Sequence, residues 1–254
     1  MTREILILFA RPPLPGRAKT RLIPALGAEG AARLYRAFLA DAAEAAAAVR
    51  AARPTVALAA EWALDGGERL EALPLAEWLP GPFLHRRQTG SDLGARMAAA
   101  LGRSLAGGGR AVLVGTDFPD LPPAIPLEAF EALARKSLQE PGLPSPPRRA
   151  AVGPAADGGY YLIGLNQPAL EIFEDIPWGS NRVFGSTLSK LQALSFDFKI
   201  LREWDDVDDP AGLAGLRARL ARAPAATAPH TRAALREPHG SPEASIGLRR
   251  RSSQ

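Results

Sequence analysis

Positively charged side chains gather in one short segment near the amino terminus, ARPPLPGRAKTRL at residues 10–22. The segment follows an apolar run and combines a flexible glycine, Gly16, with the cations Arg17, Lys19 and Arg21. A glycine lets backbone N–H groups approach a phosphate, and cations neutralise the phosphate charge. The spacing fits neither the Walker A motif nor G-x-G-x-x-G. The segment is therefore either a phosphate-binding loop of a different kind or a solvated basic loop.

One carboxylate and one acidic cluster are candidates for metal binding. Asp117 closely follows the apolar run AVLVG at 111–115. An acid delivered to a sheet edge by a strand is a common ligand of Mg²⁺, but Asp117 and Asp120 could instead cap turns around the neighbouring prolines. The sequence WDDVDDP at 204–210 either begins a helix, whose dipole favours acids there, or supplies a second carboxylate to a metal at Asp117.

A substrate hydroxyl could be bound in a third segment, GPAADGGYYLIGL. Asp157, Gly158 and Gly159 predict a turn between two strands. That turn requires the glycines but not an acid followed by two tyrosines, so Asp157 could also accept hydrogen bonds from a sugar or another hydroxylated substrate. Trp178 is either an aromatic of the core or rim, or a stacking surface for a substrate.

A weaker signal lies in QTGSDLGARM at residues 88–97. Gln88, Ser91 or Asp92 could contribute to a site. Alternatively, Asp92 and Arg96 lie four residues apart and could pair on one face of a helix.

The elements that must position these residues alternate along the chain. Continuous apolar runs are typical of strands buried on both faces, and longer amphipathic or alanine-rich stretches are typical of helices. We expect strands at 4–10, 55–60, 111–115, 150–154, 160–165 and 196–201. We expect helices at 29–52, 91–105, 126–136, 180–194 and 211–222. This alternation predicts a three-layer α/β/α sandwich with a mostly parallel central sheet, and the proline-rich stretch 139–149 is expected to be a surface loop.

Composition excludes several classes of protein. The chain has 254 residues, of which 46% are hydrophobic and 23% charged, as in ordinary globular proteins. It contains no cysteine, which excludes disulfides, iron–sulfur clusters and thiolate zinc sites. Its three histidines (His85, His230 and His239) are too scattered to predict a histidine-built metal site. Apolar runs fall short of the roughly 20 residues that cross a bilayer. Because the amino terminus also lacks a signal-peptide pattern, we expect a cytoplasmic protein without membrane insertion.

The net charge of +4 comes from the carboxyl-terminal part. Residues 222–254 contain six arginines and two glutamates, which leaves 25 basic and 25 acidic residues in 1–221. We expect one folded domain over 1–221. The segment 222–254 is rich in proline, alanine and arginine and poor in large apolar residues, so we expect a disordered tail. A neutral body lacks the basic face of a nucleic-acid-binding protein, so no nucleic-acid partner is expected.

Six motifs in this order resemble one known family. The motifs are AxxPxxGxxKTRL, Q-x-G-x-x-LG-x-RM, GTDxPDL, GPAxDGGYYLIGL, PW and DVD-x-P, spread over residues 4–221. Together they resemble the radical-SAM/selenodomain-associated transferase 1 family of the GT-A, or nucleotide-diphospho-sugar transferase, superfamily. That superfamily includes the molybdenum-cofactor guanylyltransferase and 2-phospho-lactate guanylyltransferase.

The resemblance implies a role for each candidate residue. It implies a nucleotide lined by Ala10, Arg11 and Gly16, with the cations Arg17, Lys19 and Arg21 at its phosphates and Gln88 nearby. Asp117 and Asp208 would hold Mg²⁺ or Mn²⁺. Asp157, Gly158, Gly159 and Trp178 would face the acceptor, and Lys19, Asp117 and Asp157 would carry the chemistry.

Three functions remain open at this point. The family resemblance favours a Mg²⁺-dependent glycosyl transfer from a nucleotide-sugar to a small hydroxyl acceptor. The cationic first loop suits a nucleoside triphosphate and favours nucleotidyl transfer with release of pyrophosphate. A nucleotide-binding domain without turnover is the third possibility.

Overall fold

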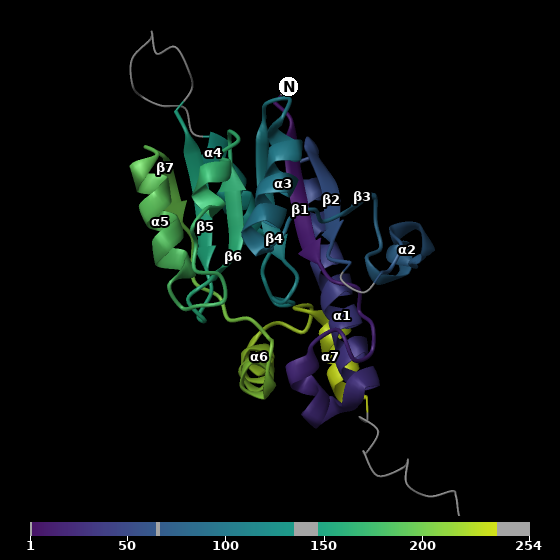
Figure 1. The fold of residues 1–254 in the computed structure, drawn as a ribbon. Coiled ribbons are helices and arrows are strands. Elements are labelled where there is room, and N and C mark those ends of the chain that lie inside the picture. Colours follow the sequence, from purple (N-terminus) through teal and green to yellow (C-terminus); the bar gives the residue numbers. More distant parts are fainter. Residues whose placement is uncertain (1, 65–66, 135–146, 238–254) are drawn as a thin grey trace, which may run out of the picture.

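A seven-stranded sheet forms the centre of the molecule (Figure 1). The computed structural model describes residues 2–64, 67–134 and 147–237. The strand order is β3-β2-β1-β4-β6-β5-β7. The strands are β1 (Glu4–Ala10), β2 (Val56–Trp62), β3 (Phe83–Arg87), β4 (Arg110–Gly115), β5 (Arg149–Pro154), β6 (Tyr160–Leu165) and β7 (Asp197–Ile200).

One strand runs against the others. β6 is antiparallel to both β4 and β5, whereas all other neighbouring pairs are parallel. The reason is local: only five residues connect β5 to β6, which suffices for a hairpin but not for the crossover that parallel strands need. The predicted α/β fold with a mostly parallel sheet is therefore confirmed.

Helices cover both faces of the sheet (Figure 1). The helices are α1 (Ile23–Ala52), α2 (Leu75–Trp78), α3 (Leu93–Leu105), α4 (Ala124–Ala134), α5 (Val183–Ala193), α6 (Pro210–Arg222) and α7 (Pro229–Arg236). Short 3₁₀ helices lie at Thr20–Leu22, Leu70–Ala72 and Leu170–Phe173. One core packs against α1 and α4, and the other against α3 and α5.

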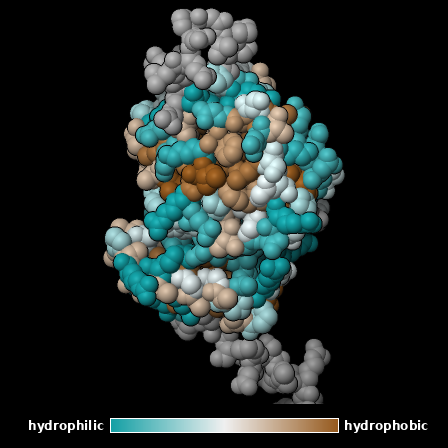
Figure 2. Space-filling model, turned by 90° about the vertical axis from the view of Figure 1, so that its left-hand side faces the viewer, coloured by the Kyte–Doolittle hydropathy of each residue, from teal (hydrophilic) through white to brown (hydrophobic). Residues whose placement is uncertain are grey.

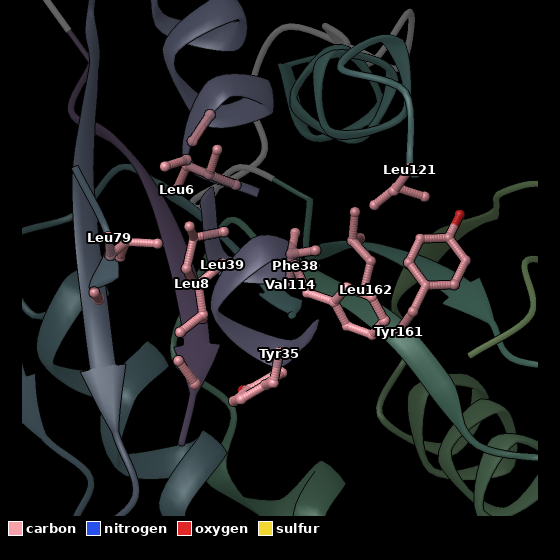
Figure 3. Close-up of a cluster of buried hydrophobic side chains, with 14 of the residues drawn as sticks. Leu6, Leu8, Tyr35, Phe38, Leu39, Leu79, Val114, Leu121, Tyr161 and Leu162 are labelled. Carbon is pink, nitrogen blue, oxygen red and sulfur yellow. The ribbon is translucent and has the colours of Figure 1, made fainter. Parts of the chain in front are cut away.

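β1 shows why its sequence is continuously apolar. Leu6 and Leu8 point into the core under α1, where Figure 3 shows them, while Ile5 and Ile7 point into the core under α3. Burial on both faces leaves no position for a polar side chain along the middle of the strand. β1 therefore lies at the centre of the sheet and delivers the basic loop 10–22 to its edge.

The predicted elements match the structure except at a few places. Strand β3 was not expected because three of the five residues in its sequence, FLHRR, are basic. In the structure the strand is only partly buried, which is why these side chains are tolerated. The helix expected at 29–52 extends back to Ile23, with an interruption at Gly27, whose φ is 71°. The one-turn helix α2 carries no periodic signal. Residues 135–136 of the helix expected at 126–136, and most of the expected loop 139–149, lie outside the described residues.

The expectation of a disordered tail from residue 222 does not hold for α7. This helix packs on α1, and the buried carboxylate of Asp41 accepts hydrogen bonds from the backbone N–H groups of His230 and Thr231 at 3.0 and 2.9 Å. Arg232 donates to four carbonyl oxygens between residues 220 and 227 and fixes the turn that precedes the helix. The predicted tail also lies outside the described residues from 238 onward.

The β7 edge of the sheet is the face shown in Figure 2. Hydrophobic side chains gather in its centre and hydrophilic ones surround them. Ile200 of β7 is 49% exposed there, and β7 pairs with β5 on its other side. Along residues 2–64, 67–134 and 147–237, no helix combines the length and apolar character needed to span a membrane.

Candidate active site

The candidate residues meet at one edge of the sheet. Two successive antiparallel pairings give β4 and β5 the same direction, so the carboxyl ends of β1, β4, β5 and β7 coincide. The loops that leave these ends carry Lys19, Asp117, Asp157 and Asp208. Open α/β sheets bind their ligands at this edge. The fold thus brings four distant segments of the sequence together.

The ammonium group of Lys19 lies between two carboxylates. Its Nζ is 2.5 Å from Oδ1 of Asp117 and 2.7 Å from Oδ1 of Asp208. The side chain is only 5% exposed. The backbone of Lys19 has φ 50°, in the left-handed region that non-glycine residues rarely adopt and that is frequent at functional sites. Three residues that the sequence assigned to one site therefore do lie in contact.

Aromatic rings and carboxylates surround the Lys19 ammonium. Nζ lies 5.4 Å from the ring centroid of Tyr35 and 5.6 Å from that of Phe38, within the range of cation–π attraction. Burial alone would lower the pKa of Lys19, but Asp117 and Asp208 outweigh burial and raise this pKa. The ammonium is therefore charged at neutral pH and acts as the counter-ion of the two aspartates.

The acidic sequence WDDVDDP combines the two roles that the sequence left open. Asp208 bonds to Lys19, whereas Asp209 caps α6 by accepting a hydrogen bond from the backbone N–H of Gly212 at 2.8 Å. Asp205 pairs with Arg219 of α6 at 2.8 Å. The segment both starts a helix and supplies a carboxylate to the candidate site.

Asp206 is a member of the site that the sequence analysis missed. Burial raises the pKa of Asp206 to about 6, and the carboxylates of Asp208, Asp157 and Asp117 add to this effect. The neighbouring Val207 is fully buried and donates its N–H to the carbonyl of Asp117 at 3.1 Å, which fixes the segment against the loop after β4. The spacing of Asp206 and Asp208 was the available signal, because residues two apart in an extended segment share a side.

Asp120 lies apart from this cluster. Its carboxylate accepts from Arg219 at 2.6 Å and from the indole N–H of Trp204 at 3.1 Å. It is buried, and the pairing ties the loop after β4 to α6. Asp120 thus has a structural role that supports the position of Asp117.

The arginines of the first loop flank Lys19 in the chain. Arg11, Arg17 and Arg21 are exposed, and Arg17 forms an ion pair with Glu68. Gly16 has φ 77°, which favours glycine, and a side chain added there would meet nothing within 4 Å. The loop therefore presents charge and open backbone to solvent, as expected for either reading of its sequence.

Gln88 occupies a different environment from the exposed arginines. It is 8% exposed, and its amide donates to the carbonyls of Ala10 at 3.3 Å and Glu61 at 2.9 Å. It thereby links the ends of β1 and β2 beneath the loop. Asp92 caps α3 by accepting from the backbone N–H of Ala95 at 2.9 Å.

Asp157 lies in the predicted turn between β5 and β6. Its Oδ1 accepts from the backbone N–H of Gly159 at 2.8 Å, and the side chain is exposed. Gly158 has φ 86°, and a Cβ there would lie 2.3 Å from the carbonyl oxygen of Asn181. Close packing therefore fixes the turn and leaves the Asp157 carboxylate facing solvent near Asp206.

Trp178 packs at the rim of the core under α3. A side chain at Gly94 would lie 2.6 Å from its indole ring, so glycine at that position makes room for the tryptophan. Its ring also meets that of Tyr160 edge-on at 6.4 Å. The indole is partly exposed, which accommodates both the core and the stacking interpretation.

The donor set suits a hard divalent cation. Asp117 and Asp208 each contact Lys19 through Oδ1, yet their side chains remain 40% and 48% exposed. Two carboxylates contact one ammonium, and the charges of Asp208, Asp157 and Asp117 also act on the neighbouring Asp206, so acidic groups outnumber the ammonium in this cluster. Carboxylate oxygens are the ligands that Mg²⁺ prefers in proteins. The donor type of Asp117 and Asp208 therefore suits a magnesium ion.

A second group of possible ligands consists of Asp41, Glu44 and His230. Both carboxylate oxygens of Asp41 already accept backbone hydrogen bonds from α7, and His230 Nε2 lies 2.9 Å from Glu44. We assign this group to the attachment of α7.

Comparison with known proteins places the chain in a family. A family profile described as "Uncharacterized protein conserved in bacteria (DUF2064)" matches residues 42–180, more than half of the chain. This chain belongs to the DUF2064 family. A search of curated proteins found no match. The matched region of DUF2064 includes Asp117, Asp157 and Trp178, while Lys19 and Asp208 lie on either side of it.

Solved structures extend the likeness over nearly the whole chain. The crystal structure of a "putative nucleotide-diphospho-sugar transferase from Desulfovibrio desulfuricans G20" is 30% identical, with a TM-score of 0.77. The alignment covers 92% of this DUF2064 chain and 95% of that one. A 4-diphosphocytidyl-2C-methyl-D-erythritol synthase from Anaerococcus prevotii DSM 20548 shares only the fold, with 9% identity, a TM-score of 0.51 and coverage of 87% and 97%. The narrower resemblance to the radical-SAM-associated family stays a prediction.

Proposed function

We propose that this protein is a Mg²⁺-dependent transferase that uses a nucleotide-activated donor. The observation that carries the proposal is the cluster of Asp117, Asp208 and Lys19 at the carboxyl edge of the sheet. Two carboxylates held in fixed geometry can bind a cation, and the exposed basic loop that follows β1 can bind the phosphates of a nucleotide. The description of the 30% identical relative as a nucleotide-diphospho-sugar transferase supports the same reaction class.

The proposed metal site and nucleotide site have different residues. Asp117 and Asp208 hold Mg²⁺, which when bound neutralises charge that develops on the phosphate of the leaving group. Arg11, Arg17 and Arg21, on the loop with Gly16, bind the donor phosphates.

For Lys19 we propose a role other than the direct phosphate binding expected from the sequence. Because its ammonium contacts Asp117 and Asp208, we assign it to holding the two carboxylates at a fixed separation. Ala10 and Gln88 support the nucleotide from below, since both are buried at the strand ends under the loop.

The acceptor is proposed to bind on the side of the β5–β6 turn. Asp157 is exposed there and can accept the hydrogen bond of an acceptor hydroxyl. Gly158 and Gly159 keep the turn free of other side chains, and the exposed part of Trp178 offers a stacking surface for a sugar or a similar ring.

Glycosyl transfer is our first choice of reaction. The bond between the anomeric carbon and the donor phosphate oxygen breaks, and the acceptor oxygen bonds to the anomeric carbon. A nucleoside diphosphate leaves, and the acceptor proton passes to the exposed carboxylate of Asp157. The description of the relative as a nucleotide-diphospho-sugar transferase supports this choice.

Nucleotidyl transfer is the second candidate. Three exposed arginines lie on one loop, and although Arg17 is paired with Glu68, this concentration of positive charge favours a nucleoside triphosphate, the more highly charged donor. In that reaction a nucleoside monophosphate moves to the acceptor and pyrophosphate leaves.

Binding and product analysis together test the proposal. Each common nucleoside triphosphate and nucleotide-sugar is tested for thermal stabilisation, with Mg²⁺ or with chelator. A ligand at about 100 times its Kd should raise Tm by roughly 5–11 °C. Asp117→Asn should abolish the Mg²⁺-dependent part of the shift. Asp197→Asn is the matched control, because Asp197 is exposed at the opposite edge of the sheet.

The product identifies the reaction. A nucleoside diphosphate indicates glycosyl transfer, and pyrophosphate indicates nucleotidyl transfer. Stabilisation that survives both chelator and Asp117→Asn, without turnover, would show a nucleotide-binding domain and contradict the proposal.

A further inference from the structure

Tyr35 lies where three parts of the candidate site meet. It belongs to α1, is 3% exposed, and sits beside the carboxyl-terminal tip of β1 (Figure 3). Its sequence context, an alanine-rich helix, is typical of a core position. Its contacts, however, include polar atoms of the loop after β1 and of the loop after β4.

The Tyr35 hydroxyl connects these two loops. It accepts a hydrogen bond from the backbone N–H of Arg11 at 3.1 Å and lies 2.8 Å from Oγ1 of Thr116. Since the Arg11 N–H can only donate, the hydroxyl proton of Tyr35 is available to Thr116. The Thr116 hydroxyl in turn lies 3.4 Å from the carbonyl of Phe9. The chain of bonds starts and ends on the backbone around the tip of β1, and Thr116 directly precedes Asp117.

The ring of Tyr35 contributes to the same site from below. The Lys19 ammonium lies 5.4 Å from its centroid, with Phe38 on the same helix at 5.6 Å. Lys19 holds both Asp117 and Asp208. One side chain therefore contacts the ammonium through its ring and the loop next to Asp117 through its hydroxyl.

Core packing alone does not account for the hydroxyl. Phenylalanine would fill almost the same volume, and burying a hydroxyl is unfavourable unless it is hydrogen-bonded. Tyr161 offers a comparison within this chain. It is also buried and packs on Phe118, but its hydroxyl donates to the carbonyl of Arg202 at 2.8 Å rather than to the loops around Lys19.

We propose that Tyr35 is a positioning residue that sets the distance between the basic loop after β1 and the carboxylate of Asp117. Its hydroxyl bonds to both the Thr116 hydroxyl and the backbone N–H of Arg11, and its ring packs against the ammonium of Lys19. That this positioning serves nucleotide and metal binding rests on the proposed function. The positioning itself is a property of the folded chain and can be measured without turnover.

Two measurements on the full chain test the proposal. The first is acetylation of lysines by an amine-reactive ester, followed by mass spectrometry. Lys199 is 44% exposed and serves as the internal reference for the buried Lys19. The second is the affinity for Mn²⁺ alone, measured by the electron paramagnetic resonance of the free ion.

Tyr35→Phe removes the hydroxyl and keeps the ring. We expect acetylation of Lys19 relative to Lys199 to rise about three- to tenfold, and Mn²⁺ affinity to fall by a similar factor, as for the loss of one buried hydrogen bond. Thr116→Val removes the other partner and should have the same effect. The double variant should show a smaller change than the sum of the two single variants, because both substitutions break the bond between the two hydroxyls. Tyr161→Phe is the matched control and should leave both measurements as in the wild type.

The outcomes separate this proposal from the proposed function. Wild-type labelling of Lys19 as fast as that of Lys199, unchanged labelling in Tyr35→Phe, or an equal increase in Tyr161→Phe would each overturn it. If the wild type binds no Mn²⁺, the metal part of the proposed function fails, while the Lys19 labelling still decides the role of Tyr35.

Discussion

Nζ of Lys19 lies 2.7 Å from Oδ1 of Asp208, although the two residues are 189 positions apart in the sequence. Lys19 follows β1 and Asp208 follows β7, the first and the last of the strands within residues 2–64, 67–134 and 147–237. Their contact joins the loop that follows β1 to the segment that follows β7. It is also the contact on which the geometry of the candidate metal site depends.

Lys19→Met tests the importance of this ion pair for stability. The variant keeps the volume of the side chain but leaves Asp117 and Asp208 without their counter-ion. We expect the free energy of unfolding to fall by about 1–2 kcal/mol, a reduced cost because both carboxylates are partly exposed to water. Urea denaturation measures the change. Lys190→Met, which removes only an exposed pair with Asp175, should cost less than about 0.5 kcal/mol; equal losses would contradict the prediction.

Asp206→Asn should have opposite effects on stability and on cation binding. Removing one of four neighbouring carboxylates relieves repulsion, so Tm in chelator should rise by a few degrees, equivalent to roughly 0.5–1 kcal/mol. The affinity for Mn²⁺ should fall, because the cluster loses negative charge. Thermal unfolding in chelator and a Mn²⁺ titration check the two parts. A lower Tm would show that Asp206 stabilises the fold rather than serving the site.

Glu4→Gln should give a loss of stability that depends on pH. Burial alone would raise the pKa of Glu4, but hydrogen bonds from Arg53, Arg110 and Thr55 outweigh burial and lower this pKa. A lowered pKa stabilises the fold above the unfolded value of about 4.3, and this stabilisation disappears as pH falls through the folded value. We expect the variant to be less stable by about 2–3 kcal/mol at pH 7. Denaturation at several pH values should show the difference shrinking below about pH 4; a constant difference would exclude the ionised carboxylate as its cause.

Asp41→Ala should detach α7 from α1. The buried carboxylate accepts two backbone hydrogen bonds from α7, and loss of a helix cap typically costs about 1–2 kcal/mol. Limited proteolysis within 223–228 should accelerate in the same variant. Glu44→Ala removes only the exposed partner of His230 and should change neither measurement appreciably. Identical behaviour of the two variants would argue against the capping role.

Two glycines with similar backbone angles should respond differently to alanine. Gly158 and Gly179 have φ of 86° and 80°, but a Cβ at Gly158 would lie 2.3 Å from the Asn181 carbonyl oxygen, whereas one at Gly179 meets nothing within 4 Å. Gly179→Ala should cost about 1–2 kcal/mol, the price of the left-handed conformation alone. Gly158→Ala should cost at least about 1 kcal/mol more. Comparable unfolding midpoints would mean that the turn at Asp157 can shift without penalty.

The sequence predicted those strands that are buried on both faces and those helices whose apolar residues recur with a strong period. The apolar runs of β1 and β4 and the long stretch of α1 identified themselves by pattern alone. β3 did not, because an edge strand such as FLHRR is apolar only at its start. α7 was missed because its attachment depends on Asp41, which is 189 residues before His230 and carries no local signal.

For the candidate site, the sequence indicated which residues lie together but not which contacts each of them makes. Lys19, Asp117 and Asp208 could be placed together because each follows the carboxyl end of a strand. That Lys19 contacts carboxylates could not be predicted, because Asp117 and Asp208 lie 98 and 189 positions away in the sequence. Tyr35 escaped notice because a tyrosine in an alanine-rich helix resembles any other core residue until its hydroxyl partners are known.

The pairing of Lys19 with Asp208 also bears on how the protein is made. During synthesis the chain emerges with its amino terminus first. Lys19 and the aromatic residues of α1 that contact it therefore appear early, Asp117 later and Asp208 last. Domains generally fold as units as they are synthesised. A nascent chain that has not yet reached the segment after β7 therefore carries Lys19 with one counter-ion at most. The site becomes complete only after the last strand of the sheet has been translated.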